Sequence, residues 1–445
     1  SEQFAKDFLI THFFNPPRYL RLLEIVQGDK TDPKIVQVVT EFCDRKLGKG
    51  VVPCKDTPGF IVNRILTFML QTGLNEAIAQ NVPLEVADSV MSKPVGLPST
   101  KMFGLMDLVG IDLMPHLAKS LLSNLPKSDA YVKGYKDYPF ITQMIAQGYT
   151  GRKGKGGFYR LDPNADKGER IKQVLRIDTE RFGEDQYELA DKPKLASVDA
   201  GKKGLKAVVT TDDAGGRFAW SVLSETLAYA ASLLGEIADS PAVIDEAMRL
   251  GCNFKNGPFE MIDALGADWL AEQLEKEGKA VPAVLKEVGE KGFYTVEDGK
   301  LHVYDPATKA HKKLDRPEGV LLLSDIKLGS DPVAKTASAA LWDIGDGALC
   351  FEFTGKMNAI DTEVFALYEK AIKLIEDEAT DYKALVIYNE GSHFSAGANL
   401  GLAIFAINIG LWPQIEELVA GGQKLYQKLK YSSFPVVSAP SGMAL

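Results

Sequence analysis

Ile10-Thr11-His12-Phe13-Phe14-Asn15-Pro16-Pro17 is the stretch of this sequence that says most about its fold and its chemistry. The apolar residues around His12 are typical of a strand, and Asn15-Pro16-Pro17 ends that strand in a turn. Glu24 and Asn63 follow at separations that suit a histidine base steered by a carboxylate. Because the chain has 5 histidines in 445 residues, candidate bases are few, and His12 has the most suggestive surroundings.

The residues around this stretch predict an α/β segment that leads into helices. Residues 7–27 hold two apolar runs, which indicate strand, turn and strand. A helix is expected over residues 32–47 and a strand over residues 51–54. The sequence DTPG at residues 56–59 is typical of a helix cap, and it predicts a long helix over residues 60–80.

Two helical regions of the sequence repeat each other. Val86-Ala87-Asp88 through FGLMDLVGIDLM (residues 103–114) aligns with Val243-Ile244-Asp245 through FEMIDALGADWL (residues 259–270) with one residue of gap. Gly-Phe-Tyr then occurs at residues 157–159 and again at residues 292–294. The shared order of these landmarks indicates a duplication.

The second copy lacks the polar residue of the first. A step of 23 residues back from Val86 reaches Asn63, whereas the same step back from Val243 reaches Trp220. We therefore interpret the second copy as a structural partner that covers the first helical region or shapes a substrate channel.

Composition narrows the classes of function. The net charge is -9, with 51 Lys+Arg against 60 Asp+Glu and no basic stripe, which argues against a nucleic-acid partner. The four cysteines are scattered without metal-ligand spacing or a disulfide pattern, so we expect no metal site and a cytoplasmic location. No signal or transit peptide is visible.

One uncharged stretch is long enough to cross a membrane. Residues 394–413 read FSAGANLGLAIFAINIGLWP. Ser395, Asn399, Asn408 and three glycines interrupt it, and its first third is typical of a turn that enters a helix. The pattern favours a buried loop and helix, so we expect no integral membrane association.

His12 has the chemistry that oxidation of a hydroxyl to a carbonyl requires. Neutral imidazole can take the hydroxyl proton as hydride leaves the carbon. Glu24, if adjacent, would fix the tautomer, and Asn63 at a helix start could donate a hydrogen bond to the substrate oxygen. The alternative from spacing alone is a histidine satisfied in the core, with Glu24 facing solvent.

Three motifs resemble the 3-hydroxyacyl-CoA dehydrogenase family. They are THFFNPP (residues 11–17), RLLEIV (21–26) and KDTPGFIVNRIL (55–66), and the resemblance covers residues 7 to about 160. It implies that His12 is the catalytic base and Glu24 its partner, and that Asn63 is a substrate-site residue. It also implies that Asn15 and Lys153 lie near the cofactor NAD.

The chain departs from this family at two places. Lys153 lies in GRKGKGGFY (residues 151–159), where the family commonly has Thr after the Lys and this chain has Gly154. A solvated lysine in a glycine-rich turn is the alternative there. The glycine-rich turn that holds the NAD pyrophosphate does not precede His12 in this sequence.

A second resemblance, to the enoyl-CoA hydratase (crotonase) family, lies near the end of the sequence. It rests on GSHFSAGANL (residues 391–400) and FPVVSAPSG (residues 434–442). It implies that the backbone amide of Ala398 is one of two oxyanion-hole donors for the thioester enolate and that Ala396 lines the CoA site. A glycine-rich turn without this role is the alternative.

The order of the motifs resembles the bifunctional bacterial proteins of fatty-acid β-oxidation, which implies a multidomain fold of α/β and all-α parts. In the α/β part that follows residue 336, strands are expected over residues 339–343, 348–353 and 384–388, with a helix over residues 363–378. The expected domains are the C-terminal part of a Rossmann domain (1–57), a helical dehydrogenase domain (58–160), a linker (161–214), a degenerate helical repeat (215–304), a linker (305–336) and the N-terminal part of a crotonase-like domain (337–445).

The function implied by the resemblance is NAD-dependent oxidation of 3-hydroxyacyl-CoA, with acyl-CoA thioesters as substrates, a hydratase domain and a homodimer built on the helical domains. Because the hydratase carboxylates of the family follow the last motif, we expect this sequence to be an internal piece of such a protein. Two alternatives stay open. One is a non-catalytic fragment that binds CoA esters or mediates dimerisation, and the other is a purely structural helical protein.

Overall fold

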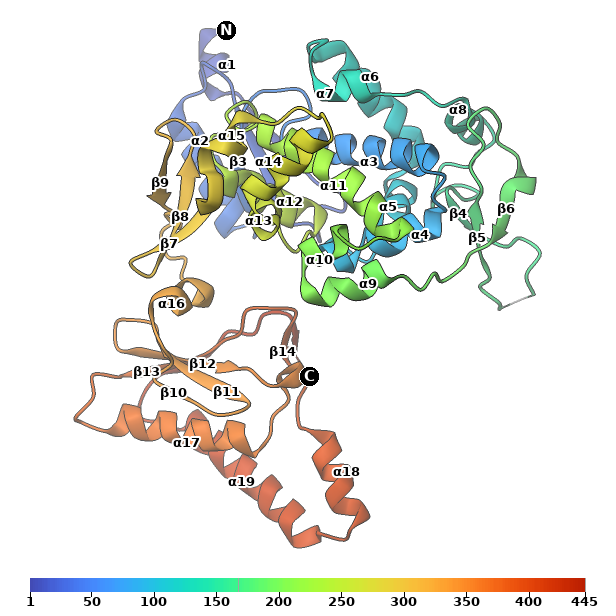
Figure 1. The fold of residues 1–445 in the computed structure, drawn as a ribbon. Coiled ribbons are helices and arrows are strands. Elements are labelled where there is room, and N and C mark those ends of the chain that lie inside the picture. Colours follow the sequence, from blue (N-terminus) through green and yellow to red (C-terminus); the bar gives the residue numbers. More distant parts are fainter. Residues whose placement is uncertain (167, 445) are drawn as a thin grey trace. The chain divides into compact units, whose positions relative to one another are not determined.

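The computed structural model describes residues 1–166 and 168–444, which form two compact units (Figure 1). The first unit contains Ser1–Thr295 and Val303–Lys312, and the second contains Val296–His302 and the residues from Lys313 on. Each unit has its own hydrophobic core, as expected for a chain that is too long for one.

The first unit begins with a small sheet, as the strand, turn and strand pattern predicts. Its elements are α1 (Glu2–Asp7), β1 (Leu9–Phe13), β2 (Leu22–Gln27), α2 (Pro33–Arg45) and β3 (Gly50–Cys54). The sheet has the order β1-β2-β3, with β1 antiparallel and β3 parallel to β2. The Asp32 side chain accepts a hydrogen bond from the Lys34 amide and so caps α2, which confirms the helix start predicted there.

The long helix after this sheet is α3 (Val62–Ala79), which confirms the predicted helix but not its predicted cap. Gly59 and Phe60 both have positive φ, at 79° and 50°, so helical geometry starts only after them. No side chain near Ile61 caps α3 locally, so the cap expected from Asp56-Thr57-Pro58 is wrong. The carboxylate that serves the first amides of α3 comes from β2 instead.

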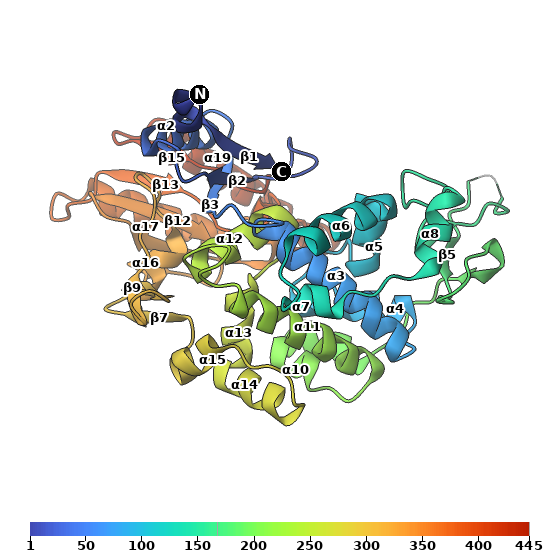
Figure 2. The ribbon, with the colours of Figure 1, turned by 90° about the horizontal axis from the view of Figure 1, so that it is seen from above.

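Two sets of helices follow from the repeat. The first set is α3, α4 (Leu84–Val90), η1 (Lys93–Val95), α5 (Met102–Val109), η2 (Ile111–Leu113), α6 (Met114–Asn124), α7 (Ala130–Gly134) and α8 (Pro139–Ala146). The second set is α11 (Ala214–Ser232), α12 (Pro241–Cys252), α13 (Pro258–Leu265), α14 (Ala267–Lys276), α15 (Ala283–Val288) and η5 (Gly289–Lys291). Helices α3 and α11 pack against each other at the centre of the first unit (Figures 1 and 2).

The duplication extends to hydrogen bonds made by aspartates. Asp107 accepts hydrogen bonds from two successive backbone amides, those of Phe158 and Tyr159 (2.8 and 2.9 Å). Asp263, its counterpart, accepts from the corresponding pair, Phe293 and Tyr294, at the same two distances. In each copy a carboxylate, buried at Asp107 and partly buried at Asp263, thus holds the Gly-Phe-Tyr turn against the helix that carries it.

A second pair of aspartates repeats in the same way. Asp88 and Asp245 are fully buried, and each accepts a hydrogen bond at 2.8 Å from the amide of the phenylalanine that opens the next motif, Phe103 or Phe259. These shared contacts support the duplication inferred from the sequence. They also explain why Asp recurs at fixed places in otherwise apolar segments.

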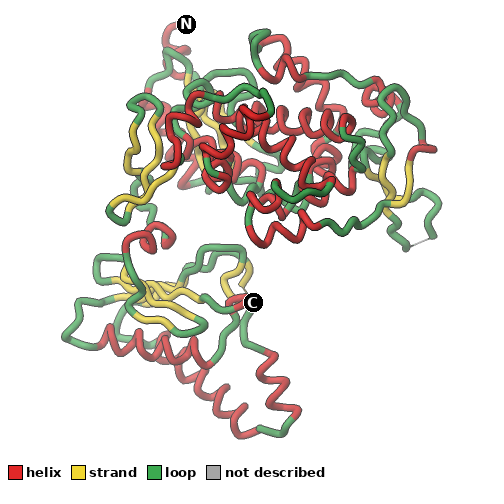
Figure 3. The backbone as a smooth tube through the Cα atoms, in the orientation of Figure 1, coloured by secondary structure: helices red, strands yellow, loops and turns green. Residues whose placement is uncertain are grey.

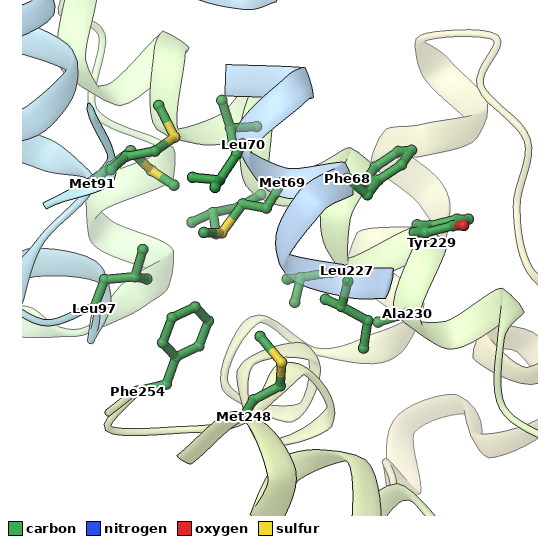
Figure 4. Packing of buried hydrophobic residues seen from close by; sticks show 14 of the residues in the cluster. Phe68, Met69, Leu70, Met91, Leu97, Leu227, Tyr229, Ala230, Met248 and Phe254 are labelled. Atoms are coloured by element: carbon green, nitrogen blue, oxygen red, sulfur yellow. The ribbon is translucent and has the colours of Figure 1, made fainter. Parts of the chain in front are cut away.

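Side chains of α3 and α11 form the centre of the first core (Figure 4). The labelled residues are Phe68, Met69 and Leu70 of α3, Leu227, Tyr229 and Ala230 of α11, and Met91, Leu97, Met248 and Phe254 of the surrounding segments. The rings of Phe68 and Tyr229 stack with their centroids 4.1 Å apart. The second copy therefore packs against the first, as expected of a structural partner.

The sheet β1-β2-β3 also packs on the second copy. Helix α12 contacts both β2 and β3. A methyl group at Gly50 would collide with Leu250, and one at Gly251 would collide with Leu22. Glycine at both positions thus allows α12 to approach the sheet closely, since a larger residue would displace these leucine side chains.

Residues 161–214, expected as a connecting segment with some extended structure, hold several short elements. They are β4 (Tyr159–Leu161), which starts just before the segment, β5 (Lys172–Leu175), η3 (Glu184–Gln186), β6 (Tyr187–Leu189), α9 (Ala196–Ala200), η4 (Gly201–Lys203) and α10 (Leu205–Val209). The three strands form an antiparallel sheet in the order β4-β5-β6. A further small sheet has the order β7 (Tyr294–Glu297), β8 (Lys300–Asp305) and β9 (Ala310–Lys313).

The second unit is built on a five-stranded sheet that helices cover (Figure 3). Its elements are α16 (Leu323–Gly329), β10 (Ala334–Lys335), β11 (Ala339–Asp343), β12 (Ala348–Phe353), η6 (Lys356–Asn358), α17 (Thr362–Glu376), β13 (Ala384–Ile387), β14 (His393–Ser395), α18 (Leu400–Asn408), α19 (Trp412–Lys430), β15 (Val436–Ser438) and β16 (Met443–Ala444). The strand order is β10-β11-β12-β13-β15, and β12, β13 and β15 are parallel. The strands and the helix predicted for this part of the chain are confirmed.

The uncharged stretch at residues 394–413 forms a turn and α18, as predicted, but its apolar side chains are not buried. Ile404 is 56% exposed, Phe405 63% and Trp412 61%. Among the elements of the second unit, α18 packs against α19, and this contact leaves Ile404 and Phe405 of α18 exposed. Within residues 1–166 and 168–444, no helix is both long and apolar enough to cross a bilayer.

Burial gives the aspartates of the repeat an opposite response to pH from that of surface carboxylates. Burial, together with the smaller effect of the nearby Glu260 charge, raises the pKa of Asp245 to about 8. A carboxyl group whose pKa is higher in the folded state binds its proton more tightly there. Its stabilising effect is complete below the unfolded pKa of about 3.9 and is lost as the pH rises towards about 8.

We predict that Asp245→Asn will make the free energy of unfolding less dependent on pH. The free energy of unfolding of the wild type minus that of the variant should fall by at least about 1.4 kcal/mol between pH 5 and 7, because the variant has no carboxyl group to titrate. Urea unfolding followed by circular dichroism measures this difference. A difference that stays constant or grows over this range would contradict the raised pKa.

Candidate functional site

His12 and Glu24 face each other across the first two strands. They are direct partners in the antiparallel register of β1 and β2. His12 Nδ1 and Glu24 Oε2 are 2.6 Å apart. The turn of residues 14–21 sets this register, so the local sequence brings together the two residues that spacing alone could only suggest.

Glu24 also supports the start of α3. Its Oε1 accepts hydrogen bonds from the backbone amides of Ile61 and Val62, at 3.2 and 3.0 Å. These are amides that a helix start leaves without an intrahelical partner, and the positive end of the helix favours a negative charge there. The Glu24 side chain has no exposed surface, so the alternative in which Glu24 faces solvent is wrong.

The geometry defines which nitrogen of His12 is available. Because Glu24 accepts through both oxygens, Nδ1 is the hydrogen-bond donor, and Nε2 carries the lone pair. Nε2 makes no hydrogen bond to any described residue of the chain, and 29% of the side chain is exposed. The rings of Phe14 and Phe60 lie 4.6 and 5.6 Å from the imidazole and limit its rotation. His12 is thus held at one nitrogen and open at the other.

Asn63 is the second residue of α3, immediately after the amides that Glu24 accepts. It is half-buried. Its side-chain amide makes no hydrogen bond with any residue in the described ranges, which is unusual for a partly buried Asn. Its donors and its acceptor are free to contact a ligand that reaches this end of the helix.

The two predicted cofactor residues lie in different surroundings. Asn15 is exposed in the turn that follows β1, two residues beyond the end of the strand that carries His12. Lys153 is half exposed and pairs with Asp112 at 2.9 Å. Within the residues that the structure describes, Lys153 makes no hydrogen bond or ion pair with His12, Glu24 or Asn63.

Two buried cations near these residues were not found from the sequence. Lys49, between Gly48 and Gly50, donates hydrogen bonds to the carbonyl oxygens of Pro17 and Leu20 in the turn after β1. Its Nζ lies 5.6 Å from the centre of the Phe13 ring. A lysine between two glycines at a helix end is typical of a solvated position, so the sequence carries no signal for its burial.

Arg64, next to Asn63, is the other buried cation. Its guanidinium donates hydrogen bonds to Asp129, to the Tyr229 hydroxyl and to Glu236 (3.1 Å for Glu236). Tyr229 belongs to α11, so Arg64 joins the first helical set to the second. These partners are 65 to 172 residues away in sequence, which no local pattern could have indicated.

Trp220, the residue that corresponds to Asn63 in the second copy, is used for packing. Its indole nitrogen donates a hydrogen bond to Glu277, and its ring meets that of Trp269 with centroids 5.3 Å apart. Both contacts lie within the second helical set. The copy that lost the polar residue thus has internal partners in place of an open amide.

The second unit has the other predicted site. Ala398 pairs with Ile360 in an isolated parallel bridge, in which the Ile360 amide donates to Gly397 O and the Asn399 amide donates to Ile360 O. The Ala398 amide itself donates to no acceptor in residues 1–166 and 168–444, and the residue is exposed. Half-buried Ala396 donates its amide to Met357 O at 3.1 Å.

No group of three or more His, Cys, Asp or Glu side chains with the geometry of a metal site occurs in the described part of the chain.

Comparisons with known proteins agree with the first of the two resemblances. Residues 2–57 match the model of the 3-hydroxyacyl-CoA dehydrogenase NAD binding domain. Residues 59–161 and 216–325 match that of the C-terminal domain of the same family. The second match to one domain model is a further indication of the duplication.

Named relatives lie in the same group. A "Probable 3-hydroxyacyl-CoA dehydrogenase" of Bacillus subtilis is 37% identical over 459 residues, which cover 100% of this chain and 55% of the relative. A Rickettsia felis protein, provisionally named a fatty acid oxidation complex trifunctional enzyme, is 34% identical over 98% of this chain and 56% of its own length. The chain thus spans just over half the length of these curated relatives.

Solved structures include the 3-hydroxybutyryl-CoA dehydrogenase of Escherichia coli. It is 21% identical, with a TM-score of 0.44 over 63% of this chain and 69% of that one.

We predict that Glu24→Ala will destabilise the first unit by about 2–4 kcal/mol, because two buried amides and His12 Nδ1 lose their acceptor. Urea unfolding measures this loss. Glu24→Gln is the matched control, since its carbonyl oxygen can still accept from Ile61 and Val62, and we expect it to lose less than half as much. Equal losses in the two variants would show that the cap contributes little.

Proposed function

The chain belongs to the 3-hydroxyacyl-CoA dehydrogenase family, and from this premise we propose that it oxidises 3-hydroxyacyl-CoA to 3-oxoacyl-CoA with NAD, as part of the gene product that contains it. The single observation that carries the proposal is the contact of His12 with Glu24 at the start of α3. It supplies an oriented base beside the open amide of Asn63.

In the proposed reaction, His12 Nε2 takes the proton of the substrate 3-hydroxyl group as the C3 hydrogen leaves with its electron pair, and the C3–O bond becomes a carbonyl. The resulting imidazolium is stabilised by Glu24, which holds Nδ1–H throughout. The Asn63 amide donates to the substrate oxygen and orients it towards His12. The Phe14 and Phe60 rings keep the imidazole in one orientation.

The residues present fit one side of the cofactor. Asn15 is exposed at the turn beyond His12, so its amide is available for the nicotinamide end of NAD. Lys153 would contribute a charge if it were released from Asp112. When bound, the nicotinamide supplies the acceptor for the hydride from C3.

We further propose that the reaction belongs to fatty-acid oxidation, with acyl-CoA thioesters as substrates, and that the second unit carries part of an enoyl-CoA hydratase site. The free amide of Ala398 and the parallel strands β12, β13 and β15 support this second proposal. Hydration of a 2-enoyl-CoA yields the 3-hydroxyacyl-CoA that the first site would oxidise. A cytoplasmic location and a homodimer stay predictions.

We predict that His12→Ala will lower the rate of 3-hydroxyacyl-CoA oxidation by about 10³-fold in the gene product that contains this chain, because it removes the base that Glu24 orients. Formation of NADH from 3-hydroxybutyryl-CoA measures the rate. Hydration of crotonyl-CoA by the same protein should be unchanged, since His12 lies in the other unit.

Glu24→Gln is the companion variant, and its rate should lie between those of the wild type and His12→Ala. The Gln amide would donate to Nδ1 and place the hydrogen on Nε2, the nitrogen that has to accept the substrate proton. A wild-type rate for His12→Ala would overturn the proposed chemistry. Equal loss of oxidation and hydration would overturn the assignment of the two reactions to different units.

We predict that Ala398→Pro will lower hydration of crotonyl-CoA by about 10²- to 10³-fold, the value of one oxyanion-hole donor. Proline removes the N–H, and this amide has no acceptor in the described structure to lose. The oxidation rate of the same protein is the internal control. Hydration at the wild-type rate would contradict a role for this amide and favour a glycine-rich turn without function.

A further inference from the structure

The turn between β1 and β2 (residues 14–21) carries Asn15. Phe14 packs against the first core at the start of this turn, and the Lys49 side chain holds the residues that follow Asn15. Lys49 lies in the residues between α2 and β3 and is 7% exposed. Its ammonium group donates to Pro17 O and to Leu20 O, at 3.0 Å for the latter. These are two carbonyl groups of the same turn.

A buried ammonium group is costly unless its donors are satisfied. Lys49 meets this condition with two carbonyl oxygens and the face of the Phe13 ring, 5.6 Å away. No carboxylate in the described residues pairs with it. Phe13 directly follows His12, and Pro17 lies two residues after Asn15. The Lys49 ammonium group therefore contacts residues close in sequence to both His12 and Asn15.

The other contacts of the turn lie within it or at its two ends. Phe14 packs against the core at the start, and the Gly50 amide donates to Arg21 O at 2.9 Å at the end. Within it, the amides of Tyr19 and Leu20 donate to Pro16 O at 2.9 and 3.0 Å. At its end, Arg21 Nε donates to Gly48 O at 3.4 Å. His12, by contrast, is fixed by the register of β1 with β2 and by Glu24. Loss of the Lys49 charge should therefore loosen Asn15 more than His12.

We propose that Lys49 is a positioning residue that fixes the turn of residues 14–21 and thereby places Asn15 against the nicotinamide end of NAD. This inference rests on the proposed function. It assigns a specific effect on cofactor binding, separate from the proton transfer at His12, to a lysine whose hydrogen bonds go to the carbonyl groups of the turn.

The test compares Lys49→Met with Lys49→Arg in the gene product that contains this chain. Lys49→Met keeps the length and apolar stem of the side chain but removes its donors, whereas Lys49→Arg keeps a cation that can donate to both carbonyls. Lys46→Met, a change at an exposed lysine three residues away, is the matched control.

For Lys49→Met we expect KM for NAD to rise by about 10-fold, with kcat within about 3-fold of the wild type and KM for 3-hydroxybutyryl-CoA unchanged. Lys49→Arg should restore most of the affinity, and Lys46→Met should match the wild type. The effects of Lys49→Met and Asn15→Ala on KM for NAD should be non-additive in a double-mutant cycle, because the first acts through the second.

A second readout does not need activity. Amide hydrogen exchange at Tyr19 and Leu20 should be faster in Lys49→Met than in Lys46→Met, with exchange in β2 unchanged. If Lys49→Met does not fold, Lys49→Gln replaces it, since it keeps one donor without the charge.

The inference is overturned if Lys49→Met has the KM for NAD of the control, if it lowers kcat in proportion to a general loss of folded protein, or if exchange in the turn is unchanged. A wild-type protein that forms no NADH from any 3-hydroxyacyl-CoA overturns the proposed function, and the positioning role falls with it. In that case, amide hydrogen exchange at Tyr19 and Leu20 still shows whether Lys49 fixes the turn.

Discussion

The Glu24 side chain has no exposed surface, and its carboxylate accepts hydrogen bonds from three donors. The connection between the first sheet and the start of α3 depends on these hydrogen bonds. A buried charge of this kind is tolerated only when its donors are in place. Two of them are the first amides of α3, and the third is His12. The same group thus joins the sheet to the helix and orients His12, so any change at Glu24 alters both the fold and the proposed catalytic site.

The sequence was informative wherever neighbours in the chain decide the structure. The strands on either side of Pro16-Pro17, the Asp32 cap and the pairing of His12 with Glu24 all follow from short-range patterns. The cap of α3 did not, because its acceptor lies 37 residues earlier. Burial of Lys49 and Arg64 could not be predicted for the same reason, because the carbonyl partners of Lys49 and the side-chain partners of Arg64 are 29 or more residues away in the sequence.

The duplication and the apolar helix α18 show how far the sequence predicts packing. Repeated Asp residues predicted the repeat, and their hydrogen bonds to matching amides give its physical basis. The apolar stretch at residues 394–413 predicted a buried helix, yet α18 contacts one neighbouring helix and exposes Ile404 and Phe405. An apolar sequence shows that burial of a segment would be favourable. Whether the segment is buried depends on the elements that pack against it.

The close approach of α12 to the first sheet bears on how this chain can be divided. The sequence pattern changes from α/β to helical at residue 57, so residues 1–57 resemble a domain that could fold without the rest of the chain. Gly50 and Gly251 allow the second helical set to seat directly on β2 and β3, and a cut at residue 57 would leave Leu22 and its neighbours without that cover. The second copy, which has Trp220 at the position of Asn63, thus supports the sheet that carries His12 and Glu24.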